Sequence, residues 1–180
     1  MWIMRYETEK VNNFALNLLD LKANQHVLEI GFGHGITLEK IAQMDESIKL
    51  AGVDHSQLAV ESFQKKSRNH SMISVECASG SQLPFNDNSF DRIFGVHIHY
   101  FLKNFRQFLL EVHRALNNDG KFILVGKYGQ KSLGNFPADV YQFYPKEEIK
   151  KQLELVGFKQ VEIKKDNMLG SELFGIIGIK

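Results

Sequence analysis

A short apolar segment that leads directly into closely spaced glycines constrains the fold of this 180-residue chain more than any other feature. Val27–Ile30 has a strand-forming composition, glycines follow at positions 31, 33 and 35, and a helical pattern begins at Ile36. Glycine lets the backbone turn sharply and come close to a ligand, because it carries no side chain. The order strand, glycine loop, helix therefore predicts a ligand-binding corner of an α/β fold.

The spacing of these glycines separates two classes of ligand. A dinucleotide-binding fingerprint has the form G-x-G-x-x-G, which would place its third glycine at Ile36. In this chain the third glycine comes one residue earlier, at Gly35. The spacing weighs against a nicotinamide or flavin cofactor, and an NAD(P)-dependent oxidoreductase is kept as an alternative that ligand preference would test.

Strand-like and helical patterns alternate along the rest of the chain. We expect strands near 50–53, 73–76, 92–96 and 121–125, with helices between them. The clearest helix carries on one face Phe105, Phe108, Leu109, Val112 and Leu116. Strands that alternate with helices predict a parallel sheet that is covered on both faces.

The two ends of the chain carry patterns of their own. We expect an amphipathic helix within the N-terminal segment 1–22, and a last helix that begins near Pro145 and ends at Gly157. The tail holds two strand-like runs, 159–164 and 174–179, which we expect to pair as an antiparallel edge. No linker divides the chain, so 1–180 is expected to form a single domain.

Composition argues against several classes of protein. The 22 basic and 21 acidic residues leave a net charge of +1, so the chain lacks the broad positive surface that is typical of nucleic-acid binding. Its apolar runs are far shorter than the roughly 18 residues of a membrane span. The single cysteine, Cys77, cannot form an internal disulfide, which fits a reducing, cytoplasmic setting.

The segment Val27–Gly35 resembles the first motif of the class I, Rossmann-like S-adenosylmethionine-dependent methyltransferases, in which a hydrophobic residue and a glutamate precede Gly-x-Gly-x-Gly. Four further motifs of that family follow in order, so the resemblance runs from about Val11 to the C-terminus. It implies a three-layer α/β sandwich with a mostly parallel seven-stranded sheet, in the order 3-2-1-4-5-7-6 with strand 7 antiparallel. It also implies S-adenosylmethionine as cofactor and S-adenosylhomocysteine as product.

Asp54 ends the second expected strand, about twenty residues beyond the glycine loop. In dinucleotide-binding folds an acid at this position accepts hydrogen bonds from the ribose hydroxyls. The resemblance implies the same use of Asp54 here. The alternative is a structural role as the N-terminal cap of the next helix, for which Ser56 is a competing candidate.

A second part of the cofactor site is expected near Leu83–Asp91, which resembles a family signature in which Leu-Pro-Phe precedes Phe-Asp. Family members usually place Asp-Ala shortly before it, where the acid contacts the adenine amino group. Here those positions are Ser79 and Gly80, and serine has no charge and a shorter reach. The residues that the resemblance implies at the cofactor are Glu29, Gly31, Phe32, Gly33, Gly35, Asp54, His55, Ser79, Gly80 and Val96.

The acceptor is expected at the end of the fourth strand, where Val96–Phe101 follows a family pattern. Ligands of open α/β sheets bind beyond the carboxyl ends of the strands, so His97, His99 and Tyr100 are the candidate catalytic residues. If the strand continues, both imidazoles point to the same side. They would then either accept a proton from the acceptor or shape its pocket, and the second interpretation is preferred. No metal site is predicted, because sequence spacing fixes no third ligand.

The aromatic-rich segment 127–144 follows the fifth expected strand and is interpreted either as a lid or as a surface loop. The short N-terminal segment and the absence of an inserted substrate domain leave few walls for a large acceptor. We therefore expect methyl transfer to an oxygen, nitrogen, carbon or sulfur atom of a small molecule. The remaining alternative is a non-catalytic, methyltransferase-like binding protein.

Overall fold

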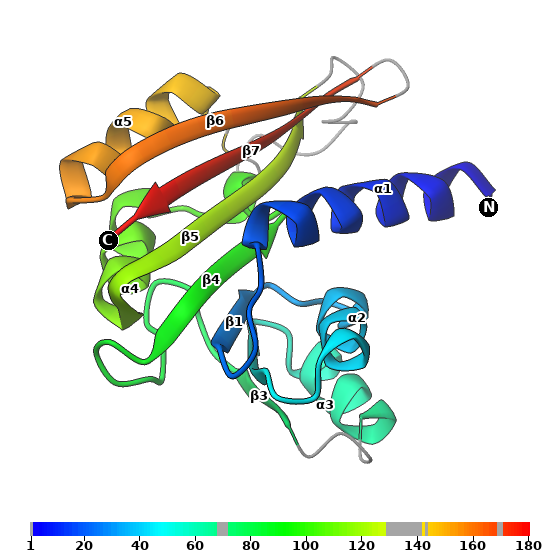
Figure 1. The fold of residues 1–180 in the computed structure, drawn as a ribbon. Coiled ribbons are helices and arrows are strands. Elements are labelled where there is room, and N and C mark those ends of the chain that lie inside the picture. The colour runs from blue at the N-terminus through cyan, green and yellow to red at the C-terminus, as the bar shows by residue number, and fades with distance from the viewer. Residues whose placement is uncertain (1, 68–71, 129–141, 143, 169–170) are drawn as a thin grey trace.

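The computed structural model describes all residues except 1, 68–71, 129–141, 143 and 169–170 (Figure 1). The helices in the described part are α1 (Trp2–Leu19), α2 (Ile36–Met44), α3 (Gln57–Lys66), the short 3-10 helix η1 (His99–Phe101), α4 (Phe105–Ala115) and α5 (Lys146–Val156). The strands are β1 (His26–Ile30), β2 (Lys49–Asp54), β3 (Ile73–Cys77), β4 (Phe90–Val96), β5 (Leu116–Tyr128), β6 (Lys159–Met168) and β7 (Ser171–Ile179).

The strands form one sheet in the order β3-β2-β1-β4-β5-β7-β6. β1 pairs in parallel with β2 and with β4, and β2–β3 and β4–β5 are parallel as well. β7 runs antiparallel to both of its neighbours, β5 and β6. The predicted strand order and the predicted antiparallel seventh strand are both confirmed.

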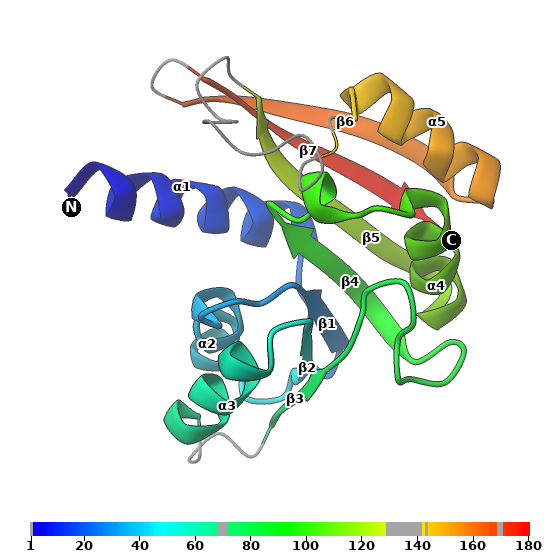
Figure 2. The ribbon, with the colours of Figure 1, turned by 180° about the vertical axis from the view of Figure 1, so that it is seen from behind.

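Helices cover both faces of the sheet, as Figures 1 and 2 show from opposite sides. The alternation of side chains along β1 decides which core each residue joins. Val27 belongs to the core beneath α1, α2 and α3, whereas Leu28 and Ile30 belong to the core beneath α4 and α5. Glu29 shares its side of the strand with Val27, because successive strand residues point to opposite faces.

The ends of the helices follow the local chemistry of the chain. Ser56 caps α3, with its hydroxyl accepting the N–H of Ala59 at 3.3 Å. Gly157 ends α5 in the left-handed region at φ 110°, as the sequence predicts. Gly35 precedes α2 at φ 70° and supplies no side-chain cap. The free N–H groups in the first turn of α2 therefore need a hydrogen-bond acceptor from another part of the chain.

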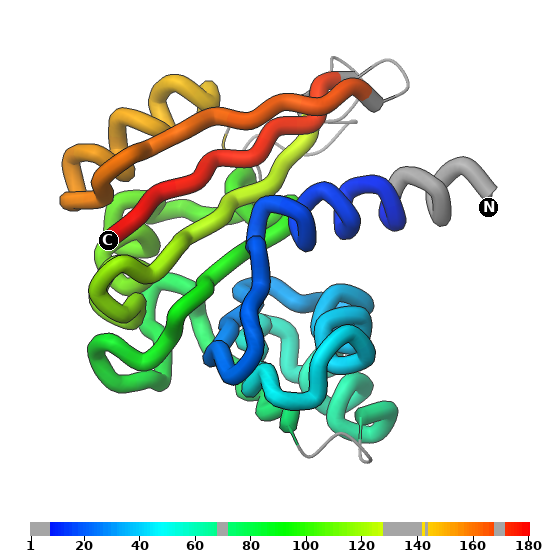
Figure 3. The backbone as a smooth tube through the Cα atoms, in the orientation of Figure 1, coloured from blue at the N-terminus to red at the C-terminus, as the bar shows by residue number. Residues whose placement is uncertain are grey.

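The fifth strand begins earlier than expected. Leu116, which the sequence pattern places on the helix, is the first residue of β5 and remains fully buried in the same core. Asp119 takes φ 62°, so the bend expected before the strand lies inside its first residues. The C-terminus lies beside this bend, where the N–H of Lys180 donates to the carbonyl of Gly120 at 3.0 Å (Figure 3).

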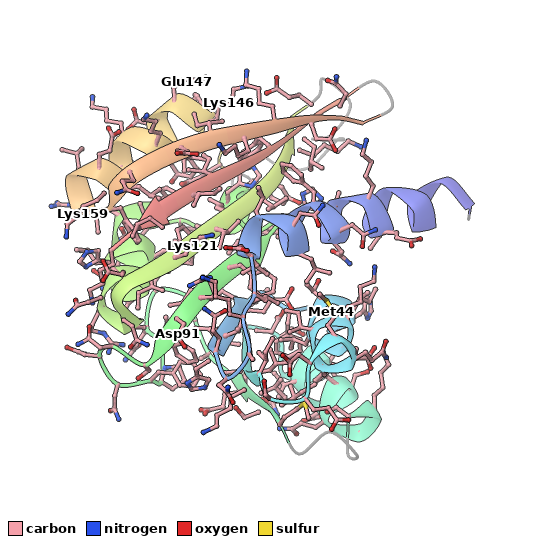
Figure 4. The ribbon with its side chains drawn as sticks, in the orientation of Figure 1. Met44, Asp91, Lys121, Lys146, Glu147 and Lys159 are labelled. Atoms are coloured by element: carbon pink, nitrogen blue, oxygen red, sulfur yellow. The ribbon has the colours of Figure 1, made fainter. Side chains whose placement is uncertain are left out.

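Two cations from the sheet hold the C-terminal end of α1. Arg92 Nε donates to the carbonyl of Leu19 at 2.9 Å, and Lys121 Nζ donates to that of Leu18 at 3.4 Å. Figure 4 labels Lys121 near this end of the helix. Positive charge at a helix C-terminus is favourable, because the last carbonyls lack partners within the helix. Among the described residues, no helix is both long enough and apolar enough to cross a bilayer.

Candidate cofactor and acceptor site

All three glycines of the loop between β1 and α2 adopt left-handed backbone conformations. Their φ angles are 73° at Gly31, 52° at Gly33 and 70° at Gly35. The N–H of Gly31 donates to Val53 at the end of β2, with a distance of 2.7 Å to its carbonyl oxygen. The loop is thus fixed against the neighbouring strand, and its conformation explains why glycine stands at each of the three positions.

The space around each glycine divides their roles. A Cβ atom added to Gly31 would lie 2.5 Å from Ile98, and one added to Gly35 would lie 2.1 Å from the ring of Phe63. A Cβ added to Gly33 would meet no described atom within 4 Å. The outer glycines therefore let the loop pack against the protein, and the middle glycine faces open space that a ligand can occupy.

Phe32, which the resemblance places at the cofactor, directs its side chain into the core. The ring is buried and packs against Phe63 with a centroid distance of 5.5 Å. Its backbone is the part that remains for a ligand. Val96 is half-buried and packs against the same core.

Asp54 joins the glycine loop to the start of α3. Its carboxylate accepts the N–H of Gly33 and the N–H of Ser56, each at 2.9 Å, and the residue is only 7% exposed. The exposed His55 ring lies 3.5 Å from the same carboxylate. A carboxylate has about four lone-pair positions, so two remain for ligand hydroxyls. The cap of α3 is Ser56, so the sequence alternative of Asp54 as that cap is wrong.

Glu29 lies beneath the same loop and is almost fully buried, at 3% exposure. The hydroxyl of Thr37 and the N–H of Leu38 hydrogen-bond its carboxyl group, so Glu29 supplies the acceptor that Gly35 does not. Its second oxygen, Oε2, has no hydrogen-bond partner among the described residues. Burial raises the pKa of Glu29 well above its usual range, and the nearby charge of Asp54 raises it further.

The segment after β3 forms a tight turn beside Asp54. The N–H of Ala78 donates to the Asp54 carbonyl at 3.0 Å, and the Ser79 hydroxyl accepts the N–H of Ser81 at 3.2 Å. A Cβ at Gly80 would lie 3.1 Å from both Ile30 and Phe108. Ser79 is exposed, and its side chain serves its own turn.

The acceptor side departs from the sequence expectation. β4 ends at Val96, His97 takes a left-handed conformation at φ 58°, and His99 begins the helix η1. The strand does not continue, so the condition under which both imidazoles would point to the same side of it is not met. The physical reason is Ile98, which packs over Gly31 and Gly95 and turns the chain away from the sheet.

The two histidines consequently have different surroundings. His99 is 2% exposed and packs edge-on against Phe174 at a ring distance of 5.3 Å, beside Gly126. Burial, with a smaller contribution from the charge of His97, lowers the pKa of His99 to about 3. A group with this pKa stays neutral at physiological pH and takes up no proton there.

His97 and Tyr100 are the remaining candidates and lie close together. Their rings are roughly parallel, with centroids 6.4 Å apart, and both residues are half-buried. The N–H of His97 donates to the carbonyl of Val125 at 2.8 Å, which ties the turn to β5.

Most of the segment 127–144, interpreted as a lid or a surface loop, lies outside the described residues. Of its described part, Tyr144 stacks on Phe105 at 4.8 Å.

Sequence reasoning missed a clamp that holds the loop before β4. Arg114 forms a two-pronged ion pair with Glu111 at 3.0 and 2.9 Å, and donates to Asp87 at 2.7 Å and to the carbonyl of Phe85 at 2.8 Å. Glu111 in turn accepts the N–H of Leu83 at 2.9 Å. The Glu-x-x-Arg spacing on a helix was the available signal, because residues three apart lie on one face.

Comparison with known proteins now decides the family. A family model described as a methyltransferase domain matches residues 28–124, which is more than half of the chain and contains the glycine loop and Asp54. The chain belongs to this family. It is a class I, Rossmann-like S-adenosylmethionine-dependent methyltransferase by family, and its cofactor is S-adenosylmethionine.

Relatives and solved structures agree with this assignment. The ubiquinone/menaquinone biosynthesis C-methyltransferase UbiE of Citrifermentans bemidjiense is 30% identical over 138 residues, which cover 73% of this chain and 57% of that protein. The chain therefore matches little more than half of that relative. A SAM-dependent methyltransferase from Aquifex aeolicus has a TM-score of 0.77 at 21% identity, with 93% of this chain and 88% of that chain covered. The [4+2]-cyclase SpnF has the same fold, with a TM-score of 0.82, 13% identity and coverages of 95% and 80%.

Proposed function

We propose that this chain transfers the methyl group of S-adenosylmethionine to a small-molecule acceptor and leaves S-adenosylhomocysteine. The observation that carries the proposal is the loop of three left-handed glycines, whose middle member faces open space and donates its N–H to the buried Asp54. Asp54 has lone pairs to spare, and Glu29, at the end of the strand before the loop, has a buried oxygen without a partner among the described residues. These residues fit a cofactor that presents ribose hydroxyls and positive charge.

Each group has a defined task in this proposal. Asp54 receives the ribose hydroxyls, Gly33 lets the cofactor approach the backbone, and Glu29 faces a cationic group. The bound cofactor supplies a methyl group on a sulfonium, which is already activated for transfer. The chain's work is then to hold donor and acceptor in line and to exclude water.

The acceptor pocket is proposed at the end of β4, where His97 and Tyr100 contact the acceptor. His99 supports this pocket from behind through its contact with Phe174, and its low pKa argues against service as a proton acceptor. A proton leaving an acidic acceptor would pass to His97, because an imidazole takes up protons near neutral pH.

A small acceptor is favoured by two observations. The helices in the described part form the layers on the sheet, without an inserted domain between them. The name of the UbiE relative places its activity in quinone biosynthesis, which is small-molecule chemistry.

The free, exposed thiol of Cys77 supports a reducing, cytoplasmic setting.

A second candidate function is cofactor binding without methyl transfer. It is favoured by Ser79, whose side chain is occupied within its own turn where an acid is usual in the family. The cyclase SpnF, which has this fold, is named for a different chemistry.

Calorimetry and turnover separate these functions. We expect S-adenosylmethionine and S-adenosylhomocysteine to bind and NAD to leave no signal, and a screen of small acceptors with labelled S-adenosylmethionine to find a methylated product. Preference for NAD would overturn the cofactor assignment. Tight cofactor binding without transfer to any acceptor class would favour the second candidate.

A further inference from the structure

The position of Glu29 on β1 accounts for its isolation. The side chain lies on the face of the sheet that carries α1, α2 and α3, and residues of the first turn of α2 hydrogen-bond it. One carboxyl oxygen has no partner among the described residues, although a buried polar atom without a hydrogen bond costs about 1–3 kcal/mol. Such an oxygen is a position that a bound ligand or an ordered water can complete.

Capping of α2 explains why a polar residue stands here but not why it is an acid. The first turn of α2 starts at Gly35 without a side-chain cap, and Thr37 and Leu38 hydrogen-bond the carboxyl group instead. A glutamine would accept the same N–H and hydroxyl bonds through its amide oxygen. The negative charge that glutamate can carry is therefore available for another task.

The charged groups on the surrounding elements do not neutralise Glu29. Asp54 on β2 acts on it with charge of the same sign. On the helices that cover this face of the sheet, Lys40 of α2 donates to Asn13, Lys66 of α3 pairs with Glu39, and Lys10 of α1 pairs with Asp166. The exposed His55 lies against Asp54.

We infer that Glu29 holds a proton in the empty protein and releases it when the cofactor binds, so that cofactor binding and proton release are coupled. The inference rests on the proposed function and extends it. Burial favours the neutral acid, since the one charge that acts on Glu29 among the described residues is that of Asp54, and a cation placed against the free oxygen favours the carboxylate. The proton leaves to solvent, and the buried carboxylate then faces a positive charge.

The chemistry of the ligands identifies which cation this is. S-adenosylhomocysteine lacks the sulfonium, so its α-ammonium group is its one cation. Methylthioadenosine keeps the adenine, the ribose and a sulfur atom but has neither the ammonium nor the carboxylate. Comparison of the two ligands therefore tests the amino-acid moiety, in which the ammonium is the group that can pair with a carboxylate.

Calorimetry in two buffers measures the released proton. Between the ordinary pKa of a glutamate and the raised pKa of Glu29 we expect S-adenosylhomocysteine to release a proton, so the binding heat is more exothermic in imidazole buffer than in phosphate, because imidazole takes up protons with more heat. Methylthioadenosine should show the same heat in both buffers. Glu29→Gln keeps the cap of α2 and should bind S-adenosylhomocysteine at least about tenfold more weakly, with no buffer dependence.

The outcomes distinguish this inference from the proposed function. If S-adenosylhomocysteine binds the wild type with equal heats in both buffers across pH 5.5 to about 8, the coupling is wrong while the cofactor assignment stands. A Glu29→Gln variant that folds and keeps the wild-type buffer dependence would assign the proton to another group and overturn the inference. If neither ligand binds, the proposed function and the inference fail together.

Discussion

The adjacent strands β1 and β4 end in the same backbone conformation but with different residues. Gly31 follows β1 at φ 73°, and His97 follows β4 at φ 58°. Ile98 packs against Gly31, so the two turns are in contact. Glycine adopts this conformation without penalty, whereas histidine adopts it at a cost of roughly 1–2 kcal/mol. The turn after β1 can therefore be predicted from its glycine, whereas the histidine after β4 does not predict a left-handed turn.

The difference also bears on function. Strained backbone at a residue other than glycine persists where the surrounding structure fixes it, and such residues gather at functional sites. In the proposed function the glycine turn serves the cofactor through its backbone. The histidine turn keeps a side chain at the same edge of the sheet, next to the expected position of the transferred methyl group. Under that proposal the two turns contribute to the site by different means, one through its backbone and the other through a side chain.

The largest expected effect is the loss of folding stability in Gly35→Ala. The added methyl group would lie 2.1 Å from the buried ring of Phe63, and alanine would also carry the left-handed strain. Overpacking and strain together should lower the free energy of unfolding by about 3 kcal/mol. Urea denaturation measures this change.

Gly33→Ala is the matched control for this effect. It carries the same strain without a clash, so it should lose only about 1 kcal/mol of stability. Its methyl group enters the open space, so S-adenosylhomocysteine should bind at least about tenfold more weakly. Equal stability losses in both alanine variants would contradict the division of roles within the loop.

Two buried titratable groups, His99 and Glu29, make the folding stability of the protein depend on pH in opposite directions. His99 has a folded pKa of about 3 against an ordinary 6.5, so the unfolded chain binds more protons between these values. Stability supplied by neutral His99 is then lost as the pH falls from 6.5 toward 3. Glu29 has a raised pKa, so its contribution falls as the pH rises above 4.5. Each slope is at most about 1.4 kcal/mol per pH unit.

Urea denaturation across this pH range tests both signs. His99→Gln should retain more of its stability than the wild type on acidification, and Glu29→Gln should lose less than the wild type as the pH rises. A His99→Gln variant that declines as steeply as the wild type below pH 6.5 would show that His99 titrates normally and is not desolvated.

These contrasts explain which features of the fold and of the site could be predicted from the sequence. The alternation of strands and helices, the glycine loop and the position of Asp54 were predictable, because periodicity, closely spaced glycines and an acid at a strand end are local signals. The strand order came from the resemblance to the family. The separation of His97 from His99 was not predictable. It depends on Ile98 filling the space over Gly31 and Gly95, which is a contact between distant segments.

The hydrogen bonds of Glu29 and Arg114 escaped the sequence for the same reason. Each joins a residue to a partner that only the folded chain brings near, Glu29 to the first turn of α2 and Arg114 to the loop at Phe85. Sequence resemblance marked Glu29 as a cofactor residue, but the unpartnered oxygen and the missing cap at Gly35 are properties of the fold.

Asp54→Ala should weaken cofactor binding by at least about tenfold, since each charge-assisted hydrogen bond contributes roughly 1.5–3 kcal/mol. It also removes the acceptor of the Gly33 and Ser56 N–H groups, so some stability is lost. Asp54→Asn should bind S-adenosylhomocysteine with an affinity between those of alanine and the wild type, because its amide oxygen still accepts one bond.

Ser56→Ala provides the control for this prediction. It removes the cap of α3 at a cost of about 1 kcal/mol and leaves the carboxylate of Asp54 in place. Its calorimetric affinity for S-adenosylhomocysteine should match the wild type. Normal binding by folded Asp54→Ala would instead make Asp54 a structural residue.

The smallest expected effect tests the hidden turn at His97. Glycine is usually less stable than alanine in regular structure, but at φ 58° it relieves strain that alanine keeps. His97→Gly should therefore be more stable than His97→Ala by about 1 kcal/mol, although both variants lose the ring. The control is Glu61, an exposed residue within α3. There Glu61→Ala should be more stable than Glu61→Gly by about 1 kcal/mol, which is the reverse of the order at position 97.

Because both variants at position 97 remove the imidazole, they should lose turnover on a confirmed acceptor to the same extent and keep their affinity for S-adenosylhomocysteine. If His97→Ala is as stable as His97→Gly, the turn after β4 carries no strain, and the parallel between the two strand ends does not hold.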